Sequence, residues 1–399
     1  MRSIRTFASL TIAALLLAAC GGGDPYVPGS GAPTGGPTTK GTFSAVVSFG
    51  DSLSDLGTYT PATAIPNTDP QLYFGGKFTT NSATSTVWVE NVAASLGLSI
   101  TPAEVGYAGV SVKCPAAADP ALANTCTGYG QGGALVTDPD GVRHSSGALT
   151  VPLKTQIANH LERFGSFKDS DLILVQGPGG NEVFKLMDTS DPTSFGSFVV
   201  QVLTQVQTGA ITAEQASALL FQPQADAQEV MKKAAVETAG YVRDEILAKG
   251  GKYVAVTNMP DLSVTPEGSA FPAPISNILS VLSQTYNLWL REGLSGQPVQ
   301  WIDLPAVFSD VKANPADYGL LNVTDRACSI STIAAITGGL ITDGFSLFCN
   351  ATPGVPYNGL EAGADPLTWL WADGNHPSTG GHKALSDAVT RQLQAAGWL

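Results

Sequence analysis

Short apolar runs recur along the chain, and the longer segments between them carry hydrophobic residues at every third or fourth position. The runs are rich in Val, Leu and aromatic residues and lie at 43–49, 171–176, 252–257 and 299–304. Apolar runs of this length are typical of strands that are buried on both faces of a sheet. The pattern therefore predicts four central strands.

The segments between the runs have the spacing of amphipathic helices. They predict helices at residues 82–96, 153–164, 193–249, 275–292 and 378–393. The longest should break near Gln222-Pro223, because proline lacks the N–H that continues a helix. Residues 99–150 are rich in Gly, Ala and Asp and are predicted to be loop with short turns, whereas 328–349 shows no clear pattern.

Strands that alternate with helices predict a mainly parallel sheet with helices on both faces. We therefore expect an α/β protein, a three-layer α/β/α sandwich of flavodoxin-like type. Residues 43–399 would form this single domain, and the helical stretch 193–249 would be an insertion into it.

The composition fits one large folded domain and excludes one class of partner. Of 399 residues, 43% are hydrophobic and 13% are charged, which is not the composition of a disordered chain. The formal net charge is −13 with only 20 Lys and Arg, so no basic patch is available for nucleic-acid phosphates. The same acidity opposes electrostatic attraction to anionic lipids, although it leaves room for a covalent anchor.

The N-terminus has the features of an export signal. Arg2 and Arg5 precede an apolar run from Phe7 to Ala18 that is too short to span a membrane. The sequence Leu-Ala-Ala-Cys at 17–20 resembles a bacterial lipobox, which implies that residues 1–19 are a signal peptide and that Cys20 is lipidated. An ordinary signal peptide followed by an incidental cysteine is the alternative.

The residues after Cys20 extend this interpretation. Residues 20–42 are mostly Gly, Pro, Ser, Thr and Ala, the composition of a flexible tether. No Asp follows Cys20 directly, which resembles sorting to the outer membrane. We therefore expect an exported lipoprotein that is held at the bacterial outer membrane through Cys20 and faces the periplasm or the cell surface.

The four remaining cysteines fit an oxidising compartment. They contain no C-x-x-C pair and no nearby pair of histidines, so we expect no metal site. Four cysteines allow three pairings, and the local pairs Cys114–Cys126 and Cys328–Cys349 close the shortest loops. We expect these two disulfides, with four reduced buried thiols as the alternative.

Only four histidines are present, which narrows the search for a catalytic base. His144 lies in a Pro- and Gly-rich loop, His160 in a predicted helix among ordinary polar residues, and His382 at a helix start. His376 differs because Asp373 precedes it by three residues in an irregular loop. A carboxylate placed there can fix the imidazole tautomer and support its protonated form. Taken alone, this pattern is usually a surface turn.

Four motifs occur in an order that favours a catalytic role for His376 over a surface turn. Residues 49–57 (Phe-Gly-Asp-Ser-Leu-Ser-Asp-Leu-Gly) follow the first strand, and Gly-rich blocks follow at 130–134 and 179–182 before the Asp-x-x-His-Pro motif at 373–377. This set resembles the SGNH, or GDSL, hydrolases over nearly all of residues 43–399.

The resemblance implies a role for each matching residue. Ser52 would be the nucleophile, and His376 with Asp373 would complete a catalytic triad. The oxyanion would be bound by the backbone N–H groups of Ser52 and Gly133 and by the side-chain amide of Asn181. Each of these donors should be needed for full turnover.

Two departures affect the oxyanion residues. Asn181 is followed by Glu182 where the family usually has Asp, and the second block begins with Gly128-Tyr129-Gly130 where Asn is more usual. The longer carboxylate could shift the loop that holds Asn181, and Gly132 is the alternative backbone donor to Gly133.

We therefore expect a carboxylic ester hydrolase that forms an acyl-enzyme and needs no cofactor or metal. Lipase, lysophospholipase and acyltransferase activities would use the same site. For a lipid substrate, the insertion at 193–249 should present an apolar face over the site, although core packing explains its hydrophobic residues equally well. An inactive, ligand-binding surface lipoprotein is the alternative from another class. The sequence leaves the substrate and the oligomeric state open.

Overall fold

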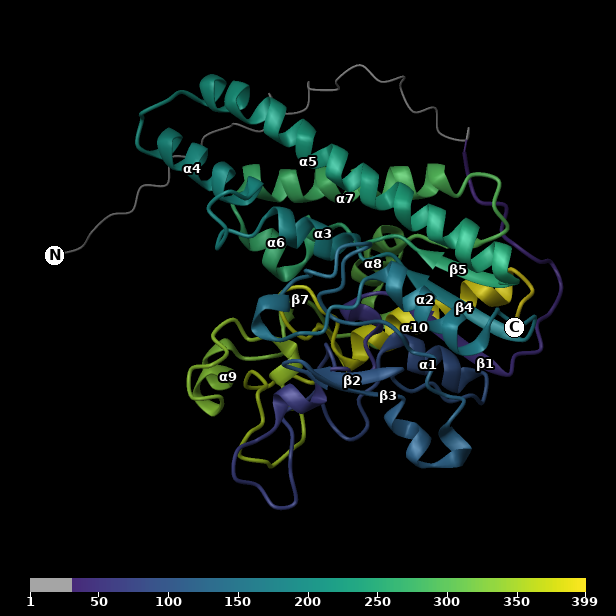
Figure 1. Ribbon diagram of the computed structural model, residues 1–399. Helices are drawn as coiled ribbons and strands as arrows, with labels where there is room; N and C mark the ends of the chain where they lie inside the picture. Colours follow the sequence, from purple (N-terminus) through teal and green to yellow (C-terminus); the bar gives the residue numbers. More distant parts are fainter. Residues whose placement is uncertain (1–30) are drawn as a thin grey trace.

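A central sheet of four parallel strands organises the protein (Figure 1). The computed structural model describes residues 31–399, so the predicted signal peptide and Cys20 lie outside the described residues. The strands follow the order β1-β4-β5-β6, and they span Ala45–Phe49, Asp171–Gln176, Tyr253–Thr257 and Gln300–Ile302. All four coincide with the predicted apolar runs. The expected α/β sandwich with a mainly parallel sheet is therefore confirmed.

Helices cover both faces of this sheet. One face is covered by α2, α3, α4, α5 and α7, which span Leu153–Phe164, Gly179–Leu186, Phe195–Gln207, Ala213–Tyr241 and Ala273–Gly293. The other face is covered by α1, α8 and α10, which span Trp88–Ser95, Leu304–Ala313 and Thr379–Ala395. Two short helices, α6 (Pro266–Ala270) and α9 (Ile330–Ile336), lie nearer the site described below.

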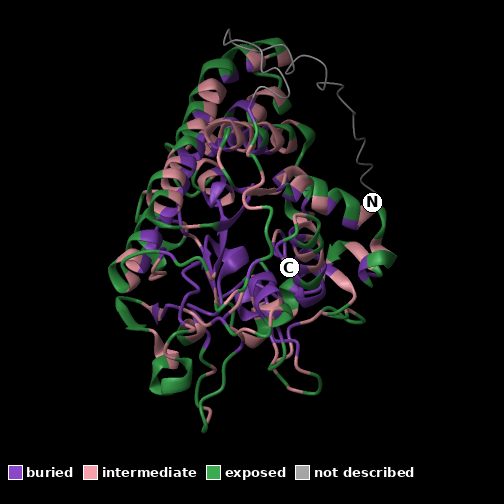
Figure 2. Cartoon of the chain, turned by 90° about the vertical axis from the view of Figure 1, so that its right-hand side faces the viewer, coloured by how far each residue is buried: buried purple, intermediate pink, exposed green. Residues whose placement is uncertain are grey.

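Alternation along the strands places one hydrophobic core on each face of the sheet. Val47 and Ile173 face the α5 side, whereas Val46 and Leu172 face the α10 side. Because both faces are covered, the strands read as continuous apolar runs. Figure 2 shows the buried residues concentrated in these central strands, with exposed residues on the outer surfaces of the helices.

The helical stretch 193–249 forms α4 and α5, but the predicted break is wrong. Pro223 lies inside α5, and the chain turns instead between Gln207 and Ala213. Thr212 caps α5 by accepting from the N–H of Gln215, whose side chain in turn accepts from the N–H of Thr212. The missing proline hydrogen bond would have involved the carbonyl of Leu219, a residue that is 46% exposed, so solvent can satisfy this group.

Several smaller elements were not expected. Within 99–150, the strands β2 (Glu104–Tyr107) and β3 (Val110–Lys113) form an antiparallel hairpin. A second small sheet pairs β7 (Asn322–Arg326) with β8 (Trp369–Trp371). The predicted disulfides Cys114–Cys126 and Cys328–Cys349 are both present, and the second closes a loop that contains α9.

The described start of the chain packs against the domain. The N–H of Thr34 donates to the carbonyl of Gln297 at 2.8 Å, and the Trp398 indole donates to the carbonyl of Pro37 at 2.7 Å. Residues 31–42, which fall within the predicted tether, are thus bound along the domain surface. Among residues 31–399, no helix is both long enough and apolar enough to span a bilayer.

Candidate active site

Ser52 lies directly after β1, at the carboxyl edge of the sheet. The Gln156 side chain holds both sides of Gly50, since its Oε1 accepts from the Gly50 N–H at 2.9 Å and its Nε2 donates to the Gly50 carbonyl at 2.8 Å. The N–H of Asp51 donates to Gln176 Oε1 at 3.1 Å. A Cβ on Gly50 would lie 2.8 Å from that oxygen, so only glycine fits this turn. The turn before Ser52 is therefore fixed by side chains from α2 and β4.

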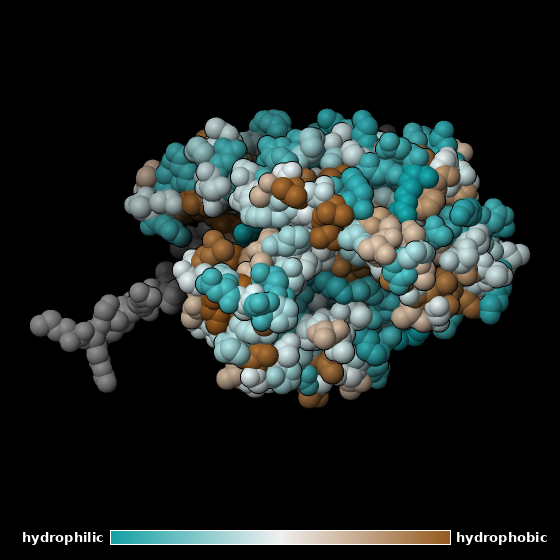
Figure 3. Space-filling view, turned by 60° about the horizontal axis from the view of Figure 1, so that its bottom comes forward, coloured by the Kyte–Doolittle hydropathy of each residue, from teal (hydrophilic) through white to brown (hydrophobic). Residues whose placement is uncertain are grey.

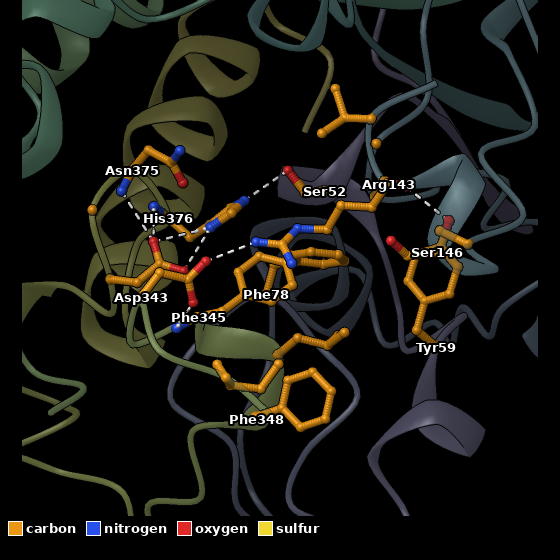
Figure 4. Close-up of a pocket in the computed structure, with 18 of the residues that line it drawn as sticks. Ser52, Tyr59, Phe78, Arg143, Ser146, Asp343, Phe345, Phe348, Asn375 and His376 are labelled. Carbon is orange, nitrogen blue, oxygen red and sulfur yellow. Dashed lines mark hydrogen bonds and ion pairs between the residues drawn. The ribbon is translucent and has the colours of Figure 1, made fainter. Parts of the chain in front are cut away.

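Ser52, His376 and Asp373 are hydrogen bonded in series. The contact between Ser52 and His376 is drawn in Figure 4. His376 Nδ1 lies 2.8 Å from Asp373 Oδ2, and His376 Nε2 lies 2.9 Å from Ser52 Oγ. Because an ionised carboxylate can only accept, Nδ1 carries the proton and Nε2 accepts from the serine hydroxyl. This is the arrangement in which a histidine can remove a proton from a serine.

The Asp373 carboxylate is surrounded by donors. It accepts from the N–H groups of His376 at 2.8 Å, Asn375 at 3.0 Å and Ser346 at 2.9 Å, in addition to the imidazole. Burial alone would raise the pKa of Asp373, but the charge of His376 and these hydrogen bonds outweigh burial and lower it. Asp373 is therefore ionised throughout the neutral range.

The pairing with Asp373 shifts the pKa of His376 in the opposite direction. Burial alone would lower the pKa of the imidazole, but the charge and hydrogen bond of Asp373 outweigh burial and raise it. The Phe78 ring packs beside the imidazole, with 5.1 Å between ring centroids. A base of this kind is shielded from water and readily holds a proton taken from Ser52.

None of the other three histidines lines the cavity at Ser52. His144 is exposed, and His382 is buried with Nδ1 accepting from the Trp88 N–H and Nε2 donating to the carbonyl of Phe78, both at 3.3 Å. The expectation that His160 has ordinary polar neighbours is wrong. Its ring is buried and stacks on Phe167 at 4.4 Å between centroids.

The three predicted oxyanion donors meet at the same cavity. Ser52, Gly133 and Asn181 all line it together with His376. Among residues 31–399, the backbone N–H groups of Ser52 and Gly133 donate no turn or loop hydrogen bond to a backbone carbonyl. Asn181 Nδ2 uses one hydrogen to bond the carbonyl of Ala134 at 2.9 Å, which leaves the second hydrogen of that amide for a ligand.

The N–H and the carbonyl of Gly132 are both hydrogen bonded within the protein, which distinguishes Gly132 from Gly133. Its N–H donates to the buried Asp55 carboxylate at 2.8 Å, and its carbonyl accepts from the Tyr59 hydroxyl at 2.7 Å. Asp55 also accepts from the N–H groups of Gly57 and Thr58 beside the nucleophile turn. The alternative donor Gly132 is thus already engaged, and the N–H available to a ligand is that of Gly133.

Gly133 also requires a glycine. Its φ is +80°, and a Cβ there would lie 2.3 Å from the carbonyl oxygen of Val142. The unusual Glu182 supports this region, because its Oε1 accepts from the N–H of Val136 at 2.9 Å. Glu182 and the adjacent Asn181 therefore both tie α3 to the segment that follows Gly133.

The cavity at Ser52 has a volume of about 730 Å³, within the range of about 300–1,000 Å³ that is usual for small-molecule sites. The loop closed by Cys328–Cys349 forms one wall, to which Phe345, Leu347 and Phe348 contribute. Arg143 from the opposite loop pairs with Asp343 at 2.7 Å and lies 4.4 Å over the Phe345 ring. Figure 4 shows this pair below the Ser52–His376 contact.

Polar side chains and backbone amides line the cavity at Ser52. Within residues 31–399, no group of three or more His, Cys, Asp or Glu side chains is arranged to hold a metal ion. The polar groups at Ser52 are a hydroxyl, an imidazole nitrogen and a set of N–H donors, an arrangement that can support attack on a carbonyl group.

Several contributors could not be located from the sequence. Three of them reach the site through a hydrogen bond to a residue that is distant in the sequence. The separation is 77 residues for Asp55, 73 for Tyr59 and 27 for Ser346. The only local signal is that Asp55 and Tyr59 follow the nucleophile turn within seven residues. Sequence pattern alone does not say which loop such residues contact.

Over part of its length, the chain is similar to known esterases. Esterase EstA from Pseudomonas aeruginosa and Esterase EstA from Pseudomonas putida are each 31% identical to it over 149 residues. The match covers 37% of this chain and 20% of each relative, so the chain spans about a fifth of the length of these curated relatives. No family model matches the chain. This partial homology supports an esterase-like hydrolase.

Proposed function

We propose that the protein is a serine hydrolase that cleaves carboxylic esters through an acyl-enzyme on Ser52. The observation that carries this proposal is the hydrogen-bonded series Asp373–His376–Ser52 at the cavity, formed by residues up to 324 positions apart. The partial similarity to Esterase EstA and the resemblance of the ordered motifs to the SGNH hydrolases point to the same chemistry.

In this mechanism, Ser52 Oγ attacks the ester carbonyl while His376 Nε2 takes its proton and Asp373 supports the imidazolium. The oxyanion accepts hydrogen bonds from the N–H groups of Ser52 and Gly133 and from Asn181. The tetrahedral intermediate collapses, His376 returns the proton to the leaving alcohol, and the acyl group stays on Ser52. Water deprotonated by His376 then releases the carboxylic acid.

Replacing Ser52 by alanine tests the proposal. We expect Ser52→Ala to lower turnover of p-nitrophenyl acetate by at least about 10³-fold, with an unchanged melting temperature. A fluorophosphonate probe should label the wild type on Ser52 and leave the variant unlabelled. Full activity of the variant, or no adduct on wild-type Ser52, would contradict the proposal. The second outcome would favour an inactive ligand-binding protein on the same fold.

We also propose that the protein is exported and anchored at the outer membrane through a lipidated Cys20. The lipobox-like sequence at 17–20 supports this, as do two disulfides of the kind found in oxidising compartments. Residues 43–399 would then be one hydrolase domain, with 193–249 as its helical insertion. Cys20→Ser should abolish incorporation of labelled fatty acid and release the protein from the membrane fraction. Membrane retention without label would contradict the anchor.

A further inference from the structure

A second, smaller cavity adjoins the site. It lies between α3, α4, α6 and α7 and has a volume of about 130 Å³. Phe184, Glu267 and Asn375 line both this cavity and the one at Ser52, so the two cavities are adjacent. Asn375 directly precedes His376. The smaller cavity, which we name the α4 groove, therefore opens beside the base of the proposed mechanism.

The walls of the α4 groove are mainly hydrophobic. Its apolar side chains include Phe184, Met187, Val200, Phe271, Ile275 and Leu279. Val200 and Phe271 are 43% and 41% exposed at its edges, so part of this apolar surface remains open to water. Figure 3 shows a face of the molecule on which hydrophobic residues gather in patches beside a hollow between its upper and lower halves.

Glu267 is the only charged residue among residues 31–399 that lines the groove, and it also lines the larger cavity. Burial, assisted by the nearby charge of Asp373, raises the pKa of the Glu267 carboxyl. The only side-chain hydrogen bond to this carboxyl among residues 31–399 comes from Asn375, at 3.5 Å. Beyond Glu267, the groove offers an occupant apolar contact and no fixed charge.

Close packing of α4 creates the groove. A Cβ on Gly196 would lie 2.4 Å from the carbonyl oxygen of Met187, so glycine allows α4 to approach the end of α3. Val200 lies one turn further along the same face of α4 and lines the groove. The insertion thus contributes apolar surface beside the site, at Gly196 and Val200. By contrast, Leu203 and Val206 pack against the core.

We propose that the α4 groove holds part of an unbranched alkyl chain of the ester substrate, so that esters with such a chain are preferred over p-nitrophenyl acetate. This inference rests on the proposed function, since the chain must belong to an ester whose carbonyl lies at Ser52. The groove is much smaller than the cavity at Ser52, about 130 Å³ against about 730 Å³, so it suits a short length of chain. Each methylene group that enters the groove should raise kcat/KM about fourfold.

The test compares chain lengths in a variant that fills the groove. Wild type, Val200→Trp and Val200→Asp are assayed on p-nitrophenyl esters from acetate to dodecanoate, below their critical micelle concentrations. Val230 on α5 has the same exposure, 43%, and lines neither cavity, so Val230→Trp and Val230→Asp are matched controls. A parallel series of 1-alkyl acetates identifies whether the acyl or the alcohol chain enters the groove.

We expect wild-type kcat/KM to rise with chain length in one of the two series. Both Val200 variants should lower kcat/KM on the longer esters at least tenfold relative to the wild type, while their kcat/KM on the acetate ester stays within twofold of it. Both Val230 variants should match the wild type at every chain length. A chain-length profile that Val200→Trp and Val200→Asp leave parallel to the wild type would overturn the inference. Wild-type activity confined to acetate would also overturn it and leave the proposed function intact. Absence of activity and of fluorophosphonate labelling would reject the proposed function itself.

Discussion

The hydroxyl of Tyr59 donates to the carbonyl oxygen of Gly132 at 2.7 Å, and it accepts from the N–H of Thr150 at 3.1 Å. The Gly132 carbonyl and the Gly133 N–H belong to one trans peptide unit and point in opposite directions. A bond to the carbonyl therefore fixes the direction of the N–H. Tyr59 thus positions the backbone donor that we assign to the oxyanion.

Tyr59→Phe should lower turnover while leaving substrate binding largely intact. The phenyl ring keeps its edge contact with Phe78, but the Gly132–Gly133 peptide loses its anchor and can rotate. Loss of one oxyanion donor typically costs about 10²–10³-fold in kcat, and partial misalignment should cost about tenfold or more. Steady-state kinetics on p-nitrophenyl acetate, together with the affinity for a boronic acid mimic of the oxyanion, measure the effect.

Tyr253→Phe is the matched control for lost stability. Tyr253 is also buried, and its hydroxyl donates to the backbone carbonyl of Thr39 at 3.1 Å, at the amino end of β5. Both variants should lower the melting temperature, but only Tyr59→Phe should lower kcat at constant KM. Equal kcat values for the two variants would show that Tyr59 has no part in the oxyanion site.

The sequence could predict the central fold because its strands are buried on both faces. Asp171–Gln176 was predicted at its exact bounds from an apolar run. By contrast, Asn322–Arg326 is polar and pairs only with a three-residue strand, so it carries no such pattern. The turn before α5 did have a signal, the Thr212-x-x-Gln215 capping box, but Pro223 was the more conspicuous residue.

Removing the Cys328–Cys349 disulfide should reduce both stability and turnover. The loop that it closes supplies the Ser346 N–H to Asp373 and contributes Phe345 to the cavity wall. Closure of a 21-residue separation contributes about 3 kcal/mol in the chain-entropy description. The Cys328→Ser/Cys349→Ser variant should therefore unfold at lower denaturant concentration, and its kcat should fall severalfold at a temperature where it is still folded.

The second disulfide serves as the comparison. The Cys114–Cys126 loop borders no part of the Ser52 cavity, so Cys114→Ser/Cys126→Ser should lose stability with a smaller change in kcat. Urea unfolding and active-site titration with a fluorophosphonate give the two quantities separately. If both double variants lost kcat to the same extent, a specific role for the Cys328–Cys349 loop would be excluded.

The activity should decline on acidification through a pKa above 6.5. His376 must be uncharged to accept the Ser52 proton, and Asp373 raises the pKa of the imidazole above its usual 6.5. As the pH falls through this raised value, His376 becomes protonated and kcat/KM drops tenfold per pH unit. The profile of kcat/KM between pH 5 and 9 measures this limb, and a limb centred at or below pH 6.5 would contradict the prediction.

Asp373→Asn should move the same limb to lower pH and reduce kcat by about 10⁴-fold. The amide removes the charge that raises the pKa of His376, and its NH₂ group cannot accept from all the N–H donors that surround Asp373. Asp169→Asn is the control, since that carboxylate is 82% exposed and lies before β4 at the opposite end of the sheet. A variant with wild-type kcat would remove Asp373 from the mechanism.

Part of the candidate site is predictable because its motifs follow strands, whereas the central fold is predictable because its strands are apolar. Ser52 follows β1, and Asn181 follows β4. Gly133 follows a strand-like segment that pairs with β1. The carboxyl ends of these parallel strands meet at one edge of the sheet, which brings the three residues together. Their motifs are local, so the sequence reveals them. Tyr59 acts on Gly133 through the peptide of Gly132, a contact that exists only after folding, and no local pattern encodes it.

His160→Phe should stabilise the protein and reduce its sensitivity to acid. Burial, with the charges of Arg163 and Lys168, lowers the pKa of His160 to about 4, and its ring nitrogens have no hydrogen-bond partner among residues 31–399. The unfolded chain takes up a proton near pH 6.5 that the folded chain accepts only near pH 4. Between pH 7.5 and 5, this histidine should therefore cost about 2 kcal/mol of the free energy of unfolding. Urea unfolding at both pH values should show a smaller loss for His160→Phe than for the wild type, and the exposed His144→Gln should match the wild type. Equal losses for all three proteins would show that His160 does not contribute to acid sensitivity.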